Sequence, residues 1–162
     1  MKYQRLRDYA TQELVVVKWT EEMSRAFQIM LQNRVRHLPV VDDDNAVIGV
    51  ISERDFQRAM QGDKPQFAPG ARVRDYMSWP VEAIDEWASI ETAARTMIDK
   101  KISSLIVTRG KQIVGIVTTE DLLRALVDSA TSPFEELKVE IKSAIYQSPI
   151  GQIAQALANA GI

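Results

Sequence analysis

Two short segments of this chain carry side chains whose types and spacing could bind a ligand. Ser52 and Asp55 stand three positions apart where a helix is predicted to begin, and Thr118 and Asp121 repeat the arrangement. A carboxylate can accept hydrogen bonds from both hydroxyls of a ribose, and the free N–H groups of a helix start attract phosphate. These residues therefore fit the recognition of a nucleoside phosphate.

The same spacing also has a structural interpretation. Ser-x-x-Asp and Thr-x-x-Asp match the helix capping box, in which the two side chains satisfy backbone N–H groups of the first turn and contribute about 1 kcal/mol. A capping Ser or Thr and a ribose-binding Asp can occur in one motif. Both interpretations remain open at the level of the motif alone.

An internal repeat explains why the motif occurs twice. Leu6–Tyr9 matches Val73–Tyr76, and farther along the chain Asp55 matches Asp121. Each copy has the periodicities of a short strand, an amphipathic helix, a two-stranded hairpin and a second helix. One copy of about 55 residues lies near the lower limit for independent folding. We therefore predict an α+β fold in which two βαββα repeats pack about a pseudo-twofold axis, followed by a C-terminal helical extension.

The apolar pattern defines the elements of each repeat. The predicted strands cover residues 14–17, 38–41 and 47–51 in the first repeat and 81–84, 105–107 and 113–117 in the second. The predicted helices carry apolar stripes over residues 23–30 and 90–97 and continue, after each hairpin, over residues 53–60 and 119–127. The stripes are those of helices packed on one face.

The predicted domain boundaries follow from the repeat and from a linker that contains Pro and Gly. They are a first repeat over residues 1–62, a linker over 63–72, a second repeat over 73–128 and a C-terminal helical extension over 129–162. Helix starts are predicted in the extension at Ser132-Pro133 and at Ser148-Pro149. The apolar faces of these helices fit either a cover on the protein's own core or a contact with a partner.

Composition excludes several classes of function. The 162 residues include 20 Lys and Arg against 22 Asp and Glu, a net charge of −2, so any anion site must be local and nucleic-acid binding is not expected. The absence of cysteine and the single histidine, His37, argue against thiol chemistry and a multi-histidine metal site. Because a membrane-spanning apolar run and a secretion signal are both lacking, we expect a cytoplasmic protein without membrane contact.

Two motifs resemble those of a known family. They are the segment Arg36–Asp42 and the Gly-x-x-Ser/Thr-x-x-Asp motif, which occurs at Gly49–Asp55 and at Gly115–Asp121. Across about residues 6–127 the chain resembles the tandem CBS domain, a pair of repeats also called a Bateman module. The resemblance implies a regulatory module, not an enzyme, that binds AMP, ADP, ATP or S-adenosylmethionine and needs no other cofactor. It also implies a homodimer that signals to a separate effector protein.

The resemblance further implies roles for individual residues. Asp55 and Asp121 would hold ribose hydroxyls, and Ser52 and Thr118 would face ribose or phosphate. The basic residues implied for phosphate in the first repeat are Arg36, His37 and Arg54, whose places in the second repeat are taken by Ser103, Ser104 and Glu120. We therefore predict two unequal clefts, with the more phosphorylated ligand near Arg36 and His37. A solvated strand edge is the structural alternative for these basic residues, and a phosphate contact across the pseudo-twofold axis would assign them to the other cleft.

Adenine needs a flat apolar slot with backbone N–H and C=O groups at its edge. Apolar residues beside the motifs could form it, although they would equally be core: Val16, Val17, Leu38 and Pro39 in the first repeat and Ala83, Ile84, Leu105 and Ile106 in the second. The three tryptophans, Trp19, Trp79 and Trp87, are interpreted as packing residues rather than as a platform for a base.

The residues are compatible with three classes of function. The favoured one is a sensor for adenosine-containing nucleotides that signals by conformational change. The alternative is a structural or protein-interaction dimer module with no physiological nucleotide. An enzyme is the weakest, since carboxylates and hydroxyls are the main reactive groups and no phosphate-binding loop or dinucleotide fingerprint is present. The two intact aspartates, Asp55 and Asp121, favour the sensor.

Overall fold

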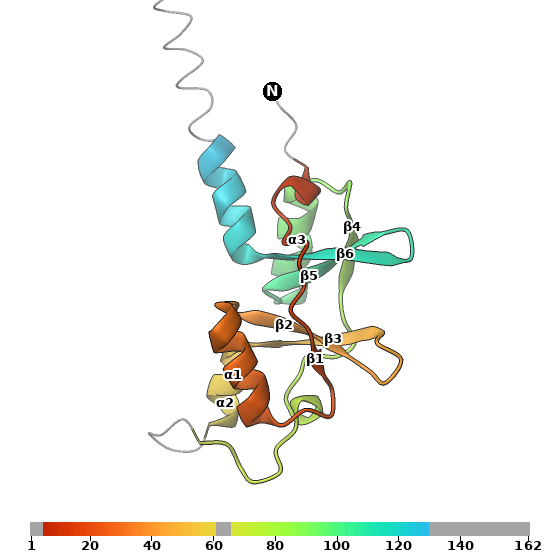
Figure 1. The fold of residues 1–162 in the computed structure, drawn as a ribbon. Helices are drawn as coiled ribbons and strands as arrows, with labels where there is room; N and C mark the ends of the chain where they lie inside the picture. The colour runs from red at the N-terminus through yellow and green to blue at the C-terminus, as the bar shows by residue number, and fades with distance from the viewer. Residues whose placement is uncertain (1–4, 61–65, 130–162) are drawn as a thin grey trace, which may run out of the picture. The chain divides into compact units, whose positions relative to one another are not determined.

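The computed structural model of the 162-residue chain describes residues 5–60 and 66–129. These residues form two repeats, each built on a three-stranded sheet (Figure 1). Both sheets belong to one compact unit that ends at Leu122. The predicted α+β fold with two repeats is confirmed. The predicted C-terminal helices lie outside the described residues.

The two repeats contain the same elements in the same order. The first consists of β1 (Val17–Lys18), α1 (Met23–Asn33), β2 (His37–Val41), β3 (Val47–Ser52) and α2 (Glu53–Ala59). The second consists of β4 (Ala83–Asp85), α3 (Ile90–Lys100), β5 (Ser104–Arg109), β6 (Gln112–Thr118) and the helical residues 119–129. A short 3₁₀ helix precedes each repeat, η1 (Leu6–Asp8) and η2 (Val73–Asp75). Within the described ranges, every helix is too short or too polar to cross a membrane.

Within each sheet the first strand is parallel to the second, and the second and third strands form an antiparallel hairpin. β1 is shorter than the predicted strand over residues 14–17 and pairs with β2 through Val17 and Lys18. Pro39 explains the difference, because it has no N–H group to continue the parallel ladder. Ile106 has the equivalent position in β5, and its N–H donates to the Glu82 carbonyl oxygen over 2.9 Å.

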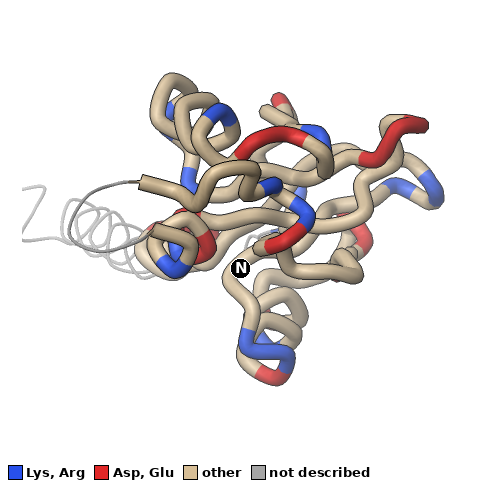
Figure 2. Tube along the Cα trace, turned by 90° about the horizontal axis from the view of Figure 1, so that it is seen from below, with Lys and Arg blue, Asp and Glu red and all other residues tan. Residues whose placement is uncertain are grey.

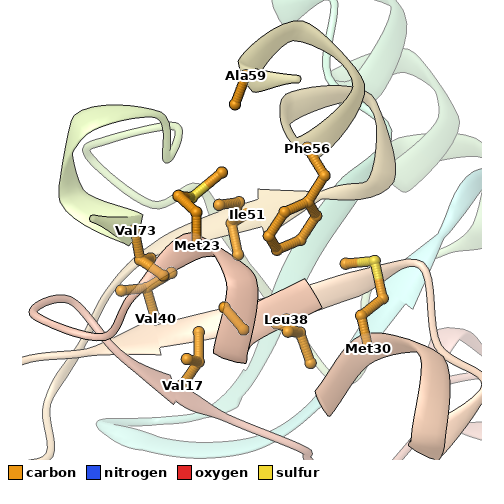
Figure 3. Close-up of a cluster of buried hydrophobic side chains, with 10 residues drawn as sticks. Val17, Met23, Met30, Leu38, Val40, Ile51, Phe56, Ala59 and Val73 are labelled. Atoms are coloured by element: carbon orange, nitrogen blue, oxygen red, sulfur yellow. The ribbon is translucent and has the colours of Figure 1, made fainter. Parts of the chain in front are cut away.

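Each repeat has a hydrophobic core between its sheet and its helices. In the first repeat, Met23 and Met30 of α1 and Phe56 of α2 pack against Leu38 of β2 (Figure 3). The spacing of the apolar residues of α1 places them on one buried face, as the sequence pattern predicts. The Phe56 ring is fully buried, and its centre lies 5.3 Å from that of Phe27.

The segment before each repeat packs on the opposite repeat. Val73 of η2 belongs to the core of the first repeat (Figure 3), whereas Leu6 of η1 belongs to the core of the second. A third cluster, formed by Val50, Ile106 and Ile116, joins the two sheets. The repeats are therefore interlocked, and each core is completed by a segment from the other end of the module.

Gly49 and Gly115 allow the two repeats to approach each other closely. A Cβ at Gly49 would lie 2.6 Å from the Ser78 carbonyl oxygen, and one at Gly115 would lie 2.7 Å from the Thr11 carbonyl oxygen. Val50 and Ser78 exchange two backbone hydrogen bonds of 3.1 and 2.9 Å, and an equivalent pair joins Thr11 to β6. The glycine of each Gly-x-x-Ser/Thr-x-x-Asp motif is thus required by a backbone contact between the repeats.

Candidate functional site

Asp55 lies in the first turn of α2 and is buried, with 6% of its surface exposed. Its Oδ2 accepts hydrogen bonds from the Ser52 N–H at 2.8 Å and from the Ser52 hydroxyl at 2.7 Å, and its Oδ1 accepts one from Arg58 Nη2 at 2.6 Å. The capping interpretation of the motif is therefore confirmed. Since a carboxylate has about four acceptor positions, Oδ1 still has capacity for a hydroxyl, and movement of Arg58 would free room for a second.

A cavity of about 450 Å³ opens beside Asp55, and we call it the Asp55 pocket. Its size is within the range of small-molecule sites. Both repeats line it, through His37, Val50, Ser52, Arg54, Asp55 and Arg58 of the first and Ser78, Pro80, Val81, Glu82, Lys101, Ile102, Ser103, Ser104 and Thr119 of the second. The structure thus brings together six predicted site residues, namely His37, Ser52, Arg54, Asp55, Ser103 and Ser104.

More cationic than anionic side chains line the Asp55 pocket. Arg54, Arg58 and Lys101 line it together with two carboxylates, those of Asp55 and Glu82. Val50, Pro80, Val81 and Ile102 add apolar surface. A pocket that combines apolar walls, a buried carboxylate and surplus cations suits a ligand with a ring system, hydroxyl groups and negative charge.

Lys101 was not predicted as a site residue, and its backbone conformation explains its position. It ends α3 in the left-handed region, at φ 55° and ψ 41°, and Arg34 ends α1 in the same way, at φ 53° and ψ 38°. This conformation costs about 1–2 kcal/mol in residues other than glycine. The resulting turn brings Lys101, Ile102 and Ser103 to the Asp55 pocket. The internal repeat aligns Lys101 with Arg34, and this alignment is the sequence signal that could have identified the two equivalent helix ends.

His37 lies at the start of β2, where the two repeats meet, and its Nε2 is 2.9 Å from Ser103 Oγ. Burial lowers the pKa of His37 below its ordinary value of 6.5, and Arg36 adds to this effect, whereas Asp55 and Asp121 oppose it. His37 is therefore neutral at pH 7. It offers a hydrogen bond rather than the positive charge expected from the sequence.

Arg36 lies outside the Asp55 pocket. Its guanidinium forms an ion pair with Glu120 of the second repeat, and both side chains are more than half exposed. Arg36 and Arg54 line a neighbouring hollow that shares His37 with the Asp55 pocket. Arg36 thus contacts the second repeat beside Asp121, and a phosphate contact across the pseudo-twofold axis stays a prediction.

Asp121 has the same local geometry as Asp55. It is 7% exposed, and its Oδ2 accepts hydrogen bonds of 2.8 Å from both the N–H and the hydroxyl of Thr118. Thr11 pairs with Ile116 of this motif, as Ser78 pairs with Val50 of the motif that contains Asp55. Capping at Asp121 therefore follows the same pattern, with segment 11–15 in the place of segment 78–82.

The residues of the predicted adenine slot lie away from the Asp55 pocket. Five of its residues are buried, namely Val17, Leu38, Pro39, Leu105 and Ile106, while Ile84 packs against the second core and Val16 and Ala83 are exposed. None of these eight described residues lines the Asp55 pocket. Val17, Leu38 and Leu105 belong to the cores of their own repeats, whereas Ile106 belongs to the cluster that joins the two sheets. The apolar walls come instead from β3, from segment 80–81 and from Ile102.

The three tryptophans, interpreted from the sequence as packing residues, differ in exposure. Trp79 is 70% exposed and Trp87 is 54% exposed, whereas Trp19 packs against the first core. Trp79 stands between Ser78 and Pro80, which both line the Asp55 pocket.

The family model described as "CBS domain" matches residues 6–62 and again residues 73–128. The chain therefore belongs to the CBS-domain family, as a tandem pair of repeats. The resemblance recognised from the two sequence motifs is confirmed.

Individual relatives agree with this assignment. An uncharacterized 17.7 kDa protein of Acidianus ambivalens is 31% identical over 137 residues, which are 82% of this chain and 79% of that protein. The chain spans 36% and 42% of the length of two other curated relatives.

Two solved structures share the fold. The CBS domain pair of protein MJ0100, in complex with methylthioadenosine and S-adenosyl-L-methionine, has a TM-score of 0.69 at 22% identity, over 78% of this chain and 98% of that chain. CBSX2 in complex with AMP has a TM-score of 0.64 at 24% identity, over 76% and 97%.

Proposed function

We propose that this protein is a regulatory module that binds an adenosine-containing nucleotide, of the class AMP, ADP, ATP or S-adenosylmethionine, between its two repeats. The Asp55 pocket carries the proposal, because a buried carboxylate and three cationic side chains meet there in a cavity lined by both repeats. Two CBS proteins of the same fold were solved with adenosine compounds, which supports the ligand class.

The roles of the lining residues follow from their positions. Asp55 Oδ1 accepts a ribose hydroxyl, and Arg58 turns from Asp55 toward the ligand's negative charge. Arg54 and Lys101 attract phosphate, and the neighbouring hollow between Arg36 and Arg54 accommodates a longer phosphate chain. The apolar walls hold the adenine ring. The proposal includes a second, unequal site at Asp121, with Thr118 and segment 11–15 in the corresponding places and Glu120 in the place of Arg54.

Signalling follows from a pocket that two repeats share. The ligand contacts α2 and β3 of the first repeat and segments 78–82 and 101–104 of the second. A ligand that binds one arrangement of these elements more tightly increases its population. The change is then transmitted to a separate effector protein, and the module needs no catalytic residue for this role.

The module acts as a homodimer in this proposal. Leu31 of α1 and Ile98 of α3 have equivalent positions in the two repeats, and they are 60% and 73% exposed. Large apolar side chains at the surface of a helix favour contact with a partner. Residues of both charge signs are distributed over the described chain (Figure 2), and this distribution gives no support to nucleic-acid binding. The cytoplasmic location stays a prediction.

The alternative, a dimer module with no physiological nucleotide, is supported by the hydrogen bonds of Asp55. Capping alone accounts for its contacts with Ser52. Capping does not account for a cavity lined by Arg54, Arg58 and Lys101 beside the capped carboxylate.

Thermal unfolding of the full chain with AMP, ADP, ATP, S-adenosylmethionine and NAD tests the proposal. A ligand at about 100 times its Kd stabilises the folded protein by about 2.7 kcal/mol, which raises Tm by about 5 °C or more. We expect one of the adenosine ligands to produce such a shift and Asp55→Asn to reduce it.

Asp75→Asn is the matched control for this substitution. Asp75 caps η2 by accepting the Arg72 N–H over 3.0 Å, just as Asp55 caps α2, but Asp75 is exposed and outside the pocket. Asp75→Asn should therefore keep the ligand shift. No shift with any of the five ligands would leave capping as the role of Asp55 and favour the dimer module.

A further inference from the structure

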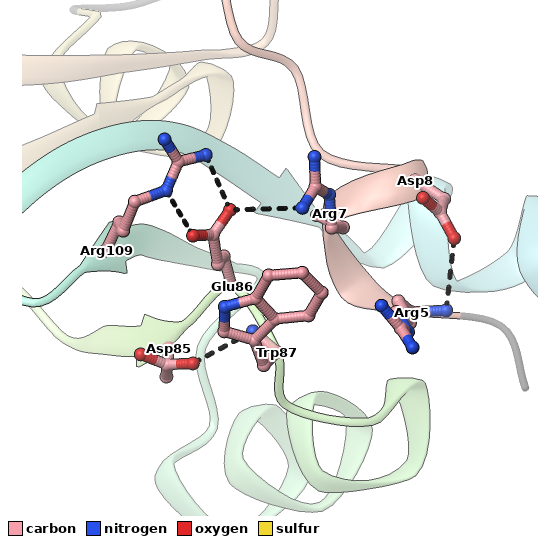
Figure 4. A network of polar contacts seen from close by, with 7 residues as sticks. All are labelled: Arg5, Arg7, Asp8, Asp85, Glu86, Trp87 and Arg109. Carbon is pink, nitrogen blue, oxygen red and sulfur yellow. Dashed lines mark hydrogen bonds and ion pairs between the residues drawn. The ribbon is translucent and has the colours of Figure 1, made fainter.

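Glu86 directly follows β4 and is almost completely buried, with 2% of its surface exposed. Arg109, at the end of β5, donates to both carboxylate oxygens, through Nε to Oε1 and through Nη2 to Oε2 at 2.9 Å (Figure 4). Arg7 of η1 reaches within 4.0 Å of Oε2. The hydrogen bonds from Arg109 lower the pKa of Glu86, so the buried carboxylate is ionised at neutral pH.

The first repeat shows that the fold does not require this cluster. Trp19 stands where the second repeat has Glu86, since each backbone N–H donates over 2.9 Å to the carbonyl oxygen at the end of the neighbouring strand. Arg74 corresponds to Arg7 and lies 5.5 Å from the Trp19 ring. An indole therefore occupies the place of the buried carboxylate. The combination of Glu86 with two arginines is specific to the second repeat.

In the lining of the cavity beside Glu86, two arginines, Arg7 and Arg109, share the single carboxylate of Glu86. Arg5 and Arg7 both lie over the ring of Trp87, at 4.9 and 4.8 Å from its centre. The two other acidic residues shown in Figure 4, Asp8 and Asp85, each accept a backbone N–H. The side chains of Arg7 and Arg109 are 39% and 59% exposed, so both guanidinium groups are held in place and still accessible.

A cavity of about 290 Å³ lies against this network, lined in part by Arg7, Gln12, Glu86, Arg109 and Gln112. Among the described residues it shares none with the Asp55 pocket. Because Arg109 uses one edge of its planar guanidinium on Glu86, its remaining N–H donors point away from that carboxylate. Donors that are oriented by a supporting residue are well suited to an anion.

We propose that this cavity is a second ligand site, separate from the nucleotide pocket, which binds a small multivalent oxyanion such as phosphate or pyrophosphate between Arg7 and Arg109. Glu86 orients Arg109 and provides the countercharge that lets two arginines lie close together in the free protein. The oxyanion adds negative charge opposite the two arginines, which have only the Glu86 carboxylate beside them in the cavity lining. The module then responds to two ligands, a nucleotide and a free oxyanion.

The three tryptophans allow a direct test by NMR, because each has one indole N–H. The labelled full chain is titrated with sodium pyrophosphate at constant ionic strength. The Trp87 indole, which contacts Arg7, should shift and saturate, whereas the indoles of Trp19 and of Trp79, beside the Asp55 pocket, should not. Arg7→Gln should weaken binding by about tenfold or more.

Lys111→Gln is the matched control, because Lys111 follows Arg109 in the same turn but does not line the cavity. It should change the affinity by less than about twofold. Arg7→Gln leaves the Arg109–Glu86 pair intact, and its dispersed amide spectrum verifies the fold. The proposal is wrong if Trp87 does not respond at millimolar pyrophosphate or if Trp79 responds with the same midpoint. It is equally wrong if the two variants weaken binding to the same extent.

Discussion

Gly49 of β3 lies against the backbone of the second repeat, at the contact that builds the Asp55 pocket. In Gly49→Ala the new Cβ would lie 2.6 Å from the Ser78 carbonyl oxygen and 3.2 Å from the Met77 sulfur. The sulfur can move aside, but the carbonyl oxygen is held because it accepts the Val50 N–H over 3.1 Å. The segment around Ser78 must therefore shift away from β3.

The size of the effect follows from this contact. Overpacking costs about 1–3 kcal/mol, and each of the two hydrogen bonds between Val50 and Ser78 contributes about 1 kcal/mol. We expect Gly49→Ala to lower the free energy of unfolding by about 2–3 kcal/mol and Tm by about 4–12 °C. Because Ser78, Pro80 and Val81 line the Asp55 pocket, nucleotide affinity should fall by about tenfold, or ~1.4 kcal/mol.

Gly110→Ala provides the control for a loss of stability alone. Gly110 has φ +60°, and a Cβ there would meet nothing within 4 Å. The substitution should cost about 1–2 kcal/mol through its left-handed backbone and leave the Asp55 pocket unchanged. Thermal unfolding and calorimetric titration compare the two variants. The reasoning would be refuted if Gly49→Ala were as stable as the wild type. It would also be refuted if Gly49→Ala and Gly110→Ala lost nucleotide affinity to the same extent.

Three further predictions follow from the same contacts. Burial lowers the pKa of His37, so the unfolded chain binds a proton that the folded chain does not, and the free energy of unfolding should fall as the pH drops below about 6.5. Urea unfolding at about pH 7 and at about pH 5.5 measures this decrease. The free energy of unfolding should decrease less in His37→Asn than in the wild type, and an equal decrease in both proteins would contradict the prediction. Phe56→Ala should cost about 3–5 kcal/mol in the same assay, because the buried ring packs against Phe27; a loss below about 1 kcal/mol would disprove that packing. In Leu31→Glu combined with Ile98→Glu, sedimentation should show a folded monomer, and a persisting dimer would place the interface elsewhere.

The α+β fold was predictable because periodicity and repetition are local properties of the sequence. The helices, the hairpins and the two capping motifs all follow from residues that are close together in the chain. The predicted length of β1 was wrong because Pro39, a residue of the partner strand β2, limits the hydrogen-bond ladder between the two strands. Effects of this kind depend on pairing, which a single segment does not show.

The first-repeat side of the candidate site was predictable, together with Ser103 and Ser104 of the opposite wall. Ser52 ends β3 and Asp55 lies three residues later in the first turn of α2, so their spacing identifies them. The opposite wall, from Ser78 to Glu82 and from Lys101 to Ser104, depends on how the interlocked repeats face each other. The neutral state of His37 likewise results from burial between the repeats, which the sequence pattern does not specify.

The central claim is that Asp55 receives a ribose in a pocket shared by two repeats. Calorimetric titration with AMP and with its 2′,3′-dideoxy analogue, on the wild type and on Asp55→Asn, tests it most directly. Loss of the hydroxyls should weaken binding to the wild type by about tenfold or more, and to Asp55→Asn by less than about twofold, because the same hydrogen bonds are already lost. Equal affinity of the wild type for both ligands, or an equal loss in both proteins, would contradict the account.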